Sequence, residues 1–183
     1  MVLLRHGESR ATVDGVAGGQ RGCQGLSELG RHQAEALAAR LSATGELAGA
    51  SVLLSSTLRR AVETAEVVSP ALGGLPIEQD ADLSEMNPGE GDGLTWEEWE
   101  ARYGGFDVAA EPYRPLAPGG ESWAEFGLRV GRTLTRLVDA YTGRTIVAAC
   151  HGGVIEHALV HGLGLPAQIP PAHRVHTVST SHS

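Results

Sequence analysis

Two short apolar segments that lie far apart in the chain each run directly into a histidine followed by glycine. The first leads into Arg-His-Gly at residues 5–7, and the second, 145–150, leads into His-Gly-Gly at 151–153. A short apolar run that stops at such residues is typical of a buried strand. Neighbouring parallel strands of an open α/β sheet end at one edge, where loops converge and ligands bind. We therefore expect His6 and His151 to lie close together at that edge.

The rest of the chain alternates strand-like apolar runs with helical patterns. Residues 52–55 form a third such run, and a helix over 57–68 follows, which carries Arg59, expected to face solvent, and Arg60. This order predicts an α/β fold, a three-layer α/β/α sandwich with a mainly parallel central sheet. The glycine-rich residues 11–25 are expected to form a long loop beside the site.

Capping residues and apolar periodicity predict the other elements. These are a helix from Ser27 to about Gly45, a strand from Ile77, helices from Thr95 to Tyr103, from Ser122 to about Tyr141 and from about 153 to 162, and a last strand within 173–183. Leu29 and Val138 belong to the apolar stripes of the first and the long helix, so both are expected to face the core.

Composition limits the classes of protein to which the chain can belong. The 183 residues suit one domain, 1–183, and no apolar run approaches the ~20 residues of a membrane-spanning helix. A net charge of -8 argues against general affinity for nucleic acid or anionic membranes. None of the 14 basic residues is lysine, which excludes a lysine Schiff base. Two cysteines, and a start that enters the first strand directly, predict a cytoplasmic protein without a disulfide framework.

Four motifs, in one order along nearly the whole chain, resemble the signatures of the histidine phosphatase superfamily, also called phosphoglycerate mutase-like. They are Arg5-His6-Gly7, residues 55–65 with Arg60, Leu83-Ser84-Glu85 followed by Gly89 and Gly93, and Cys150-His151-Gly152-Gly153 followed by Val154 and Ile155. The resemblance implies that His6 is transiently phosphorylated and that Arg5 and Arg60 bind phosphate. It also implies that His151 stabilises the transition state, and that Glu85 protonates the leaving oxygen and then activates water.

The chemistry of these residue types fits the implied roles, because phosphoryl transfer needs a nucleophile and positive charge around the phosphoryl oxygens. An unprotonated imidazole nitrogen of His6 is a competent nucleophile, and Arg5 beside it disfavours the imidazolium form. The planar guanidinium of Arg60 can bind two phosphate oxygens at once. The N–H groups of 152–153 begin a helix and are expected to bind another oxygen. Glu85 can act as acid and then as base if a water-poor pocket raises its pKa.

Two positions depart from the family pattern. Thr12 stands where family members often carry an asparagine that contacts phosphate, and its hydroxyl can still donate over a shorter reach. Gly91 stands where an aromatic residue often precedes the acid-glycine pair, which is expected to loosen the loop behind Glu85. Nearby acids that compete with Glu85 for the role of proton donor are Asp82, Glu90 and Asp92. These departures put substrate fit in question rather than reaction type.

Four other residues carry weaker chemical patterns. His157 and His161 have i,i+4 spacing, but no cluster of metal ligands accompanies them, so no metal site is expected. Cys150 is expected to be a small core residue, because a cysteine phosphatase loop would need arginine six residues later. Ser9 stands in a run that resembles a nucleophile elbow only superficially, because that elbow belongs deeper in a sheet.

Residues 86–120 are expected to form a lid-like insertion over the pocket. They include Trp96, Trp99 and Tyr103, whose helical spacing favours a helix that packs on the core over a substrate-binding surface. A mutase needs a closed, water-poor site to retain a phosphoryl group, and this usually takes a larger insertion than residues 101–120 supply. Hydrolysis is therefore the simpler fate of the phosphohistidine.

The sequence thus predicts a metal-independent phosphomonoesterase without a cofactor, acting on a small phosphorylated metabolite. The expected catalytic residues are His6, Glu85, His151, Arg5 and Arg60, and the expected substrate-binding residues are Arg5, Thr12, Arg60, His151 and Gly152. A phosphoglycerate mutase and a non-catalytic binder of phosphorylated ligands remain as alternatives. The expected partner is a small phosphomonoester, not nucleic acid or a membrane, and a homodimer is left open.

Overall fold

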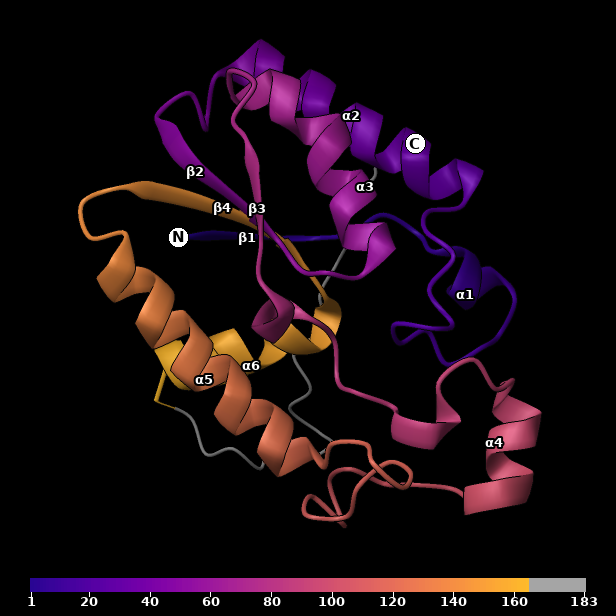
Figure 1. The fold of residues 1–183 in the computed structure, drawn as a ribbon. Coiled ribbons are helices and arrows are strands. Elements are labelled where there is room, and N and C mark those ends of the chain that lie inside the picture. Colours follow the sequence, from indigo (N-terminus) through magenta and orange to yellow (C-terminus); the bar gives the residue numbers. More distant parts are fainter. Residues whose placement is uncertain (165–183) are drawn as a thin grey trace.

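The computed structural model describes residues 1–164, which form one sheet covered by helices (Figure 1). The strands are β1 (Val2–Arg5), β2 (Ala50–Ser55), β3 (Ile77–Gln79) and β4 (Thr145–Cys150). The helices are α1 (Arg10–Val13), α2 (Glu28–Thr44), α3 (Arg59–Val68), α4 (Trp96–Tyr103), α5 (Trp123–Ala140) and α6 (Gly152–Gly162), with 3-10 turns at Ser69–Leu72, Ala81–Leu83 and Gly89–Gly91. The strand expected within 173–183 lies outside the described residues.

All four strands run parallel, in the order β1-β4-β2-β3. Arg5 at the end of β1 lies opposite Cys150 at the end of β4, and the N–H of His6 donates to the carbonyl of Cys150 at 3.0 Å. On the other side of β4, the N–H of Ser56 donates to the carbonyl of Ala149 at 3.0 Å. The ends of three neighbouring strands therefore meet at one edge, as the two histidine-glycine motifs predicted.

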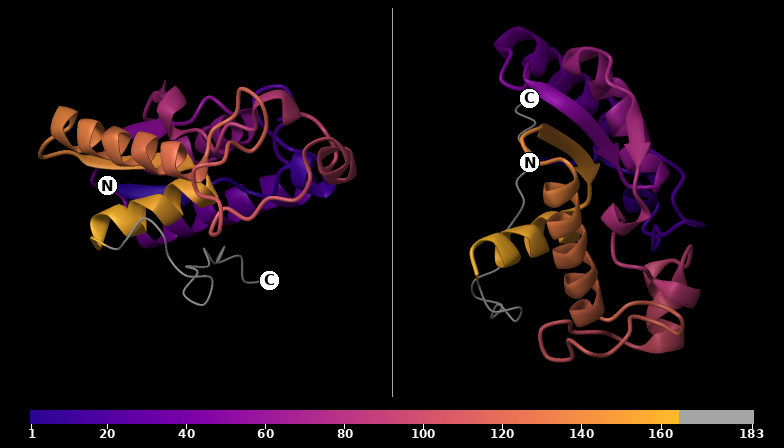
Figure 2. Two further views of the ribbon diagram at one scale, coloured as in Figure 1. Left: turned by 90° about the horizontal axis from the view of Figure 1, so that it is seen from below. Right: turned by 60° about the vertical axis from the view of Figure 1, so that its left-hand side comes forward.

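Side chains of the central strands alternate between two hydrophobic cores, one on each face of the sheet. Leu53 and Val147 pack with Leu41 of α2 and Val68 of α3. The other core combines strand residues with residues of α5 and α6, among them Val52, Leu54, Ile146, Phe126, Leu137 and Val154. Figures 1 and 2 show α2 and α3 on one side of the sheet and α5 and α6 on the other. The structure confirms the three-layer sandwich with a parallel sheet.

The helices begin where the capping residues predicted. The Ser27 hydroxyl accepts a hydrogen bond from the N–H of Gly30 at the start of α2, and Gly45 ends this helix with a φ of 64°. The capping boxes expected at Thr95 and Ser122 are both present at the starts of α4 and α5. A cap of this kind contributes about 1 kcal/mol. Local sequence therefore sets the boundaries of the helices that frame the site.

Two residues expected in the core are exposed instead. Leu29 and Val138 are each 53% exposed. In α2 the buried face includes Gly30, against which neighbouring backbone packs so closely that a side chain would not fit. In α5 the buried stripe ends at Leu137. Adjacent helical positions differ by about 100°, so the residue next to each of these buried positions points toward solvent.

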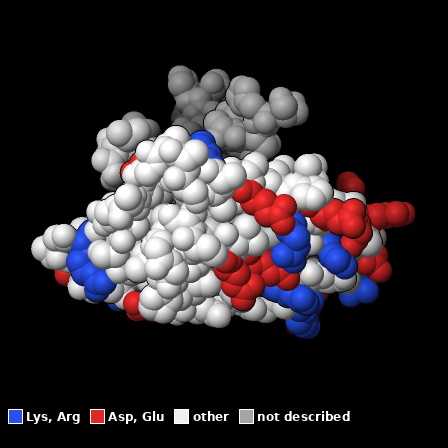
Figure 3. Space-filling model, turned by 90° about the horizontal axis from the view of Figure 1, so that it is seen from above, with Lys and Arg blue, Asp and Glu red and all other residues white. Residues whose placement is uncertain are grey.

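The described surface carries both signs of charge. Figure 3 shows one face of the molecule, on which acidic and basic side chains lie side by side toward one end. The net charge of the whole chain is -8. Within residues 1–164, no helix combines the length and the apolar character needed to cross a membrane.

Candidate active site

A cavity of about 320 Å³ opens beside the ends of β1 and α3. Its wall includes the predicted site residues Arg5, His6, Thr12, Arg60 and Glu85. Two other predicted residues, His151 and Gly152, are not part of this wall. His151 is fully buried beside His6, with 5.0 Å between the centroids of the two rings. The structure therefore gathers most of the predicted site around one cavity and places the second histidine beneath it.

Hydrogen bonds fix the tautomer of His6. The Nε of Arg60 lies 3.0 Å from Nε2 of His6 and can only donate, so Nε2 accepts and carries no proton. Nδ1 then carries the ring proton and donates it to the carbonyl of Gly7 at 2.6 Å. The nitrogen with the available electron pair is therefore Nε2, on the side of Arg60.

The surroundings of His6 disfavour its imidazolium form. Burial is the main cause that lowers the pKa of His6 to about 3, and the guanidinium of Arg60 adds to it. The carbonyl of Gly7 opposes the shift, and Arg5 contributes a smaller lowering. The sequence assigned this effect to Arg5, whereas in the structure burial and Arg60 contribute more. His6 is thus held in the neutral, nucleophilic form.

Arg60 is buried although it carries a charge. Its side chain is in the first turn of α3, the residue is 5% exposed, and its Nη1 donates to the carbonyl of Gly18 at 2.6 Å. The neighbouring Arg59 instead pairs with Glu63 at 2.8 Å, and its side chain is 69% exposed. The two arginines therefore point in different directions, Arg60 to the site and Arg59 to solvent, as predicted.

Ser56 is a buried neighbour of His151 that the motifs did not indicate. Its Oγ lies 2.7 Å from Nε2 of His151, and both residues are fully buried. Nδ1 of His151 is buried and has no hydrogen-bond partner among the described residues. Burial lowers the pKa of His151 well below its usual range, with a further contribution from Arg60. The strand-end argument that selected the two histidines would also have selected Ser56, which follows β2.

The carboxylate of Glu85 reaches the N-terminus of α6. Its Oε2 accepts from the N–H of Gly153 at 3.1 Å, and its Oε1 accepts from the N–H of Met86 at 3.1 Å. A side chain at position 153 would overlap the Glu85 carboxylate and the buried ring of Phe126, which favours glycine there. The sequence predicted that the Gly153 N–H binds a phosphate oxygen. In the structure it binds Glu85 instead, because the carboxylate already occupies the helix N-terminus.

The acids that compete with Glu85 have other surroundings. Asp92 accepts from three backbone N–H groups within 19–22, at 2.8 to 2.9 Å. Asp82 forms a surface ion pair at 3.3 Å, and Glu90 is exposed. Among the described residues that line the cavity, Glu85 is the one carboxylate. The geometry therefore favours Glu85 over the other three acids.

Thr12 lies in α1, a single helical turn inside the segment that was expected to be a loop throughout. The Ser9 hydroxyl caps this turn, because it accepts from the N–H of Thr12 at 3.2 Å. The Thr12 hydroxyl lies 2.9 Å from the same oxygen. The segment is thus held at its start by the helical turn and further on by Asp92.

One wall of the cavity is aromatic, which the helical spacing over 95–103 did not indicate. Trp99 and Tyr103 nevertheless pack in a hydrophobic cluster, as that spacing predicted. Trp96 and Trp99 of α4 line the cavity together with Phe106. Trp99 is 2% exposed, but it packs with Ala17 and Ala117 in a small cluster apart from the two sheet cores. Helical spacing alone cannot distinguish a stripe that faces the core from one that faces a cavity.

Gly91 makes room for this aromatic wall. A side chain at position 91 would overlap the ring of Trp99. The absence of an aromatic residue at 91 was expected to loosen the loop, but Trp99 fills the adjacent space. Asp92 then fastens the loop through its three backbone hydrogen bonds.

Comparison with known protein families agrees with this arrangement. The family model described as histidine phosphatase superfamily (branch 1) matches residues 1–183. The chain belongs to the histidine phosphatase superfamily. This membership confirms the resemblance that the four motifs indicated.

Similar proteins include some with mutase and phosphatase names. The chain is 32% identical over 165 residues to phosphoglycerate mutase-like protein 4 of Arabidopsis thaliana, covering 85% of this chain and 67% of that protein. It is 33% identical over 182 residues to a bifunctional protein of Mycobacterium tuberculosis, covering 96% of this chain but only 47% of that protein. A mycobacterial glucosyl-3-phosphoglycerate phosphatase, solved in complex with VO3, has 31% identity and a TM-score of 0.75, covering 92% of this chain and 82% of that one.

Other chemical groups of this histidine phosphatase chain lie away from the cavity. Burial raises the pKa of the Cys150 thiol to about 12, and its side chain packs in a sheet core, as expected of a structural cysteine. A larger cavity of about 720 Å³ lies between α5 and α6. It contains His157 and His161 but none of the predicted site residues, so the smaller cavity is the candidate active site.

Proposed function

We propose that this chain is a metal-independent phosphomonoesterase that hydrolyses a small phosphorylated metabolite through a phosphohistidine on His6. The observation that carries the proposal is the state of His6, whose unprotonated Nε2 lies 3.0 Å from a buried guanidinium at the wall of a cavity. A neutral imidazole beside fixed positive charge suits attack on a phosphoryl group. Family membership and the phosphatase name of a similar structure support the same reaction.

The first step forms a bond between Nε2 of His6 and phosphorus while the ester P–O bond breaks. Protonated Glu85 gives its proton to the leaving oxygen, so that an alcohol departs. Arg60 turns from Nε2 to the phosphoryl oxygens as substrate enters, and Arg5 binds them from the cavity wall.

The second step consumes water. The Glu85 carboxylate takes a proton from water, whose oxygen attacks phosphorus as the P–N bond breaks. Phosphate leaves, and His6 is neutral again. The same carboxyl group thus acts first as acid and then as base.

His151, Gly152 and Thr12 complete the proposed site. His151 has an Nδ1 without a partner among the described residues, which makes it a candidate donor to a phosphoryl oxygen. His151 is fully buried, and its ring lies beside that of His6. Thr12 supplies a hydroxyl on the cavity wall. Gly152 starts α6 and has its N–H at the helix N-terminus.

The domain organisation, the partner and the location of the protein stay predictions. We propose one domain over 1–183, in which the segment 86–120 acts as a lid. The aromatic side chains of this segment on the cavity wall support the lid. The proposed partner is a small phosphomonoester, and a homodimer and a cytoplasmic location remain untested expectations.

Phosphate release is the direct test of this function. The wild type, in the presence of a chelator, is expected to release phosphate from at least one member of a panel of phosphomonoesters, and His6→Asn is expected to release none above background. With 3-phosphoglycerate and 2,3-bisphosphoglycerate, sustained isomerisation without phosphate release would identify a mutase instead. Binding of phosphorylated ligands without either reaction would identify a binder.

The role of Glu85 has its own test. Glu85→Gln is expected to lower kcat/KM by at least about 100-fold for an alkyl phosphate, because an alkoxide needs a proton to leave. The loss is expected to be much smaller for 4-nitrophenyl phosphate, whose phenolate leaves unaided. Glu90→Gln is the matched control, since Glu90 is exposed and does not line the cavity. Equal losses for both substrates would show that Glu85 is not the proton donor.

A further inference from the structure

The wall of the candidate active-site cavity carries both charged and apolar side chains. Arg5, Arg60 and Glu85 are charged, and the neutral His6 lies beside Arg60. Most of the remaining wall is apolar and includes Val16, Met86, Pro88, Trp96, Trp99, Phe106 and Leu116. A substrate held with its phosphoryl group at His6 would therefore place its alcohol part against apolar and aromatic side chains.

The aromatic residues of the wall hold one another in place. Trp99 is the centre of the group, with its ring centroid 5.9 Å from that of Trp96, 5.9 Å from that of Phe106 and 5.6 Å from that of Tyr103. Trp99 is buried, whereas Trp96 is 52% exposed and Phe106 is 43% exposed. The buried ring fixes the group, and the two outer rings keep free surface. Such a preformed aromatic surface favours flat apolar ligands.

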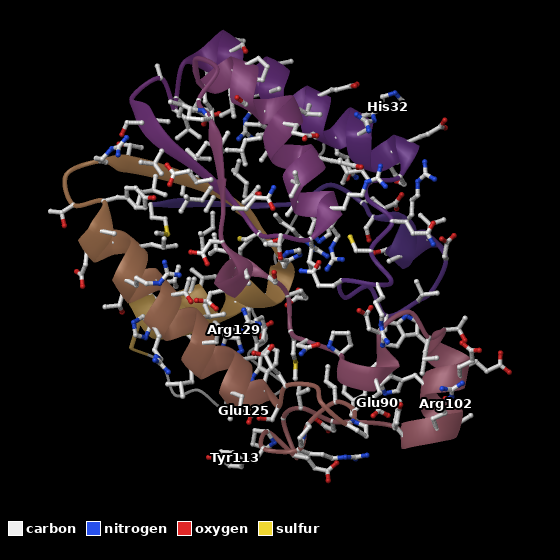
Figure 4. The ribbon with its side chains drawn as sticks, in the orientation of Figure 1. His32, Glu90, Arg102, Tyr113, Glu125 and Arg129 are labelled. Carbon is white, nitrogen blue, oxygen red and sulfur yellow. The ribbon has the colours of Figure 1, made fainter. Side chains whose placement is uncertain are left out.

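The charges of the wall are sufficient for one phosphoryl group only. Arg5 and Arg60 are the two cationic side chains among the described residues that line the cavity, and both lie next to His6. A second anionic group on a substrate would meet Glu85 or the apolar wall without a cation to pair with. Arg102, which is on α4 in Figure 4, is exposed and does not line the cavity. Burying an unpaired anion is costly, so the wall disfavours such substrates.

We propose, building on the phosphatase function above, that the site selects phosphomonoesters whose alcohol part carries an aromatic or flat apolar group. Phosphoglycerates, bisphosphates and sugar phosphates are then poor substrates. The cavity of about 320 Å³ suits a small molecule of this kind.

The test compares esters of primary alcohols, so that the leaving groups are similar and only the rest of the molecule differs. The substrates are 2-phenylethyl phosphate, glycerol 3-phosphate, 3-phosphoglycerate and glucose 6-phosphate. The wild type is expected to show a kcat/KM for 2-phenylethyl phosphate at least about tenfold above the others, which is the selectivity that burial of one apolar group provides. Equal or higher values for 3-phosphoglycerate or glucose 6-phosphate would overturn the proposal.

Single substitutions in the aromatic wall test whether this wall is the source of the selectivity for aromatic substrates. Trp96→Ala and Phe106→Ala are each expected to lower kcat/KM for 2-phenylethyl phosphate by about tenfold and to leave methyl phosphate within about twofold. Tyr113→Ala is the matched control, because Tyr113 is an exposed aromatic residue that Figure 4 shows near the start of α5, away from α4. Unchanged selectivity in both wall variants would contradict the proposed role of the wall.

A binding measurement separates this inference from the phosphatase function. The wild type is expected to bind 3-phenylpropylphosphonate, which cannot be hydrolysed, at least about tenfold more tightly than methylphosphonate. Phosphate release without any aromatic preference in turnover or binding would overturn the substrate class alone. Aromatic preference in binding without phosphate release from any ester would overturn the proposed function and leave the wall as a ligand-binding surface.

Discussion

The Oγ of Ser56 lies 2.7 Å from Nε2 of His151, and both side chains are fully buried. The same Oγ accepts from the N–H of Leu58 at 3.3 Å, and among the described residues Nε2 of His151 is the one acceptor within reach of the hydroxyl proton. Nε2 is then the acceptor, and Nδ1 carries the ring proton. Ser56 therefore selects the tautomer in which Nδ1 can donate to a phosphoryl oxygen.

Ser56→Ala is expected to lower kcat by about tenfold or more, because the ring of His151 loses the contact that fixes its tautomer. The unpaired Nε2 also costs about 1–3 kcal/mol of stability. Ser55→Ala is the matched control, since Ser55 is equally buried and donates to the carbonyl of Ser56 at 2.9 Å. Steady-state kinetics and urea unfolding should show similar losses of stability in both variants but a loss of kcat in Ser56→Ala only. Equal kcat values would argue against a positioning role.

Arg60→Lys is expected to reduce kcat/KM by at least about 100-fold although the positive charge is kept. A lysine cannot reproduce the fork that donates from Nε to His6 and from Nη1 to Gly18. Arg59→Lys changes the neighbouring residue in the same way, but at an exposed ion pair, and is expected to leave kcat/KM within about twofold. Comparable effects of the two substitutions would contradict the assignment of Arg60 to the phosphoryl group.

The stability of the protein is expected to fall as the pH falls below about 6.5. Burial and Arg60 lower the pKa of His6 to about 3, so the unfolded chain binds a proton at this position between these pH values and the folded protein does not. The free energy of unfolding therefore decreases by up to about 1.4 kcal/mol per pH unit for such a histidine.

Urea unfolding of the wild type and of His6→Asn between pH 6 and pH 4.5 checks this linkage. The asparagine variant cannot take up the proton in either state, so its stability should depend less steeply on pH. Parallel curves for the two proteins would mean that His6 is not held neutral by the fold.

Local sequence predicted the fold and the meeting of the motifs well. The apolar runs of β1 and β4 end in His6 and His151, and parallel strand order alone brings these ends together. Thr95 and Ser122 marked the starts of two helices, because a capping box needs only residues three positions apart. Capping boxes and apolar runs depend on neighbours in the chain, whereas the meeting of His6 and His151 follows from the parallel strand order.

The features that sequence missed depend on contacts between separate elements. Trp99 of α4 lines the cavity, and Gly91, in the 3-10 turn Gly89–Gly91, leaves space for its ring. The N–H of Gly153 was predicted to face phosphate, but Glu85 reaches it from the other side of the site. Full burial of His151 likewise depends on how several elements pack around it. No periodicity or motif encodes such contacts directly.

Rapid-quench intact mass spectrometry tests the central claim most directly. After mixing with a substrate that releases phosphate, the wild type is expected to carry one phosphoryl group transiently, with the acid lability of a phosphohistidine. His6→Asn is expected to show neither the adduct nor turnover, whereas His32→Asn, a change at an exposed histidine of α2 in Figure 4, should behave like the wild type. Equal turnover in His6→Asn and the wild type would contradict the mechanism.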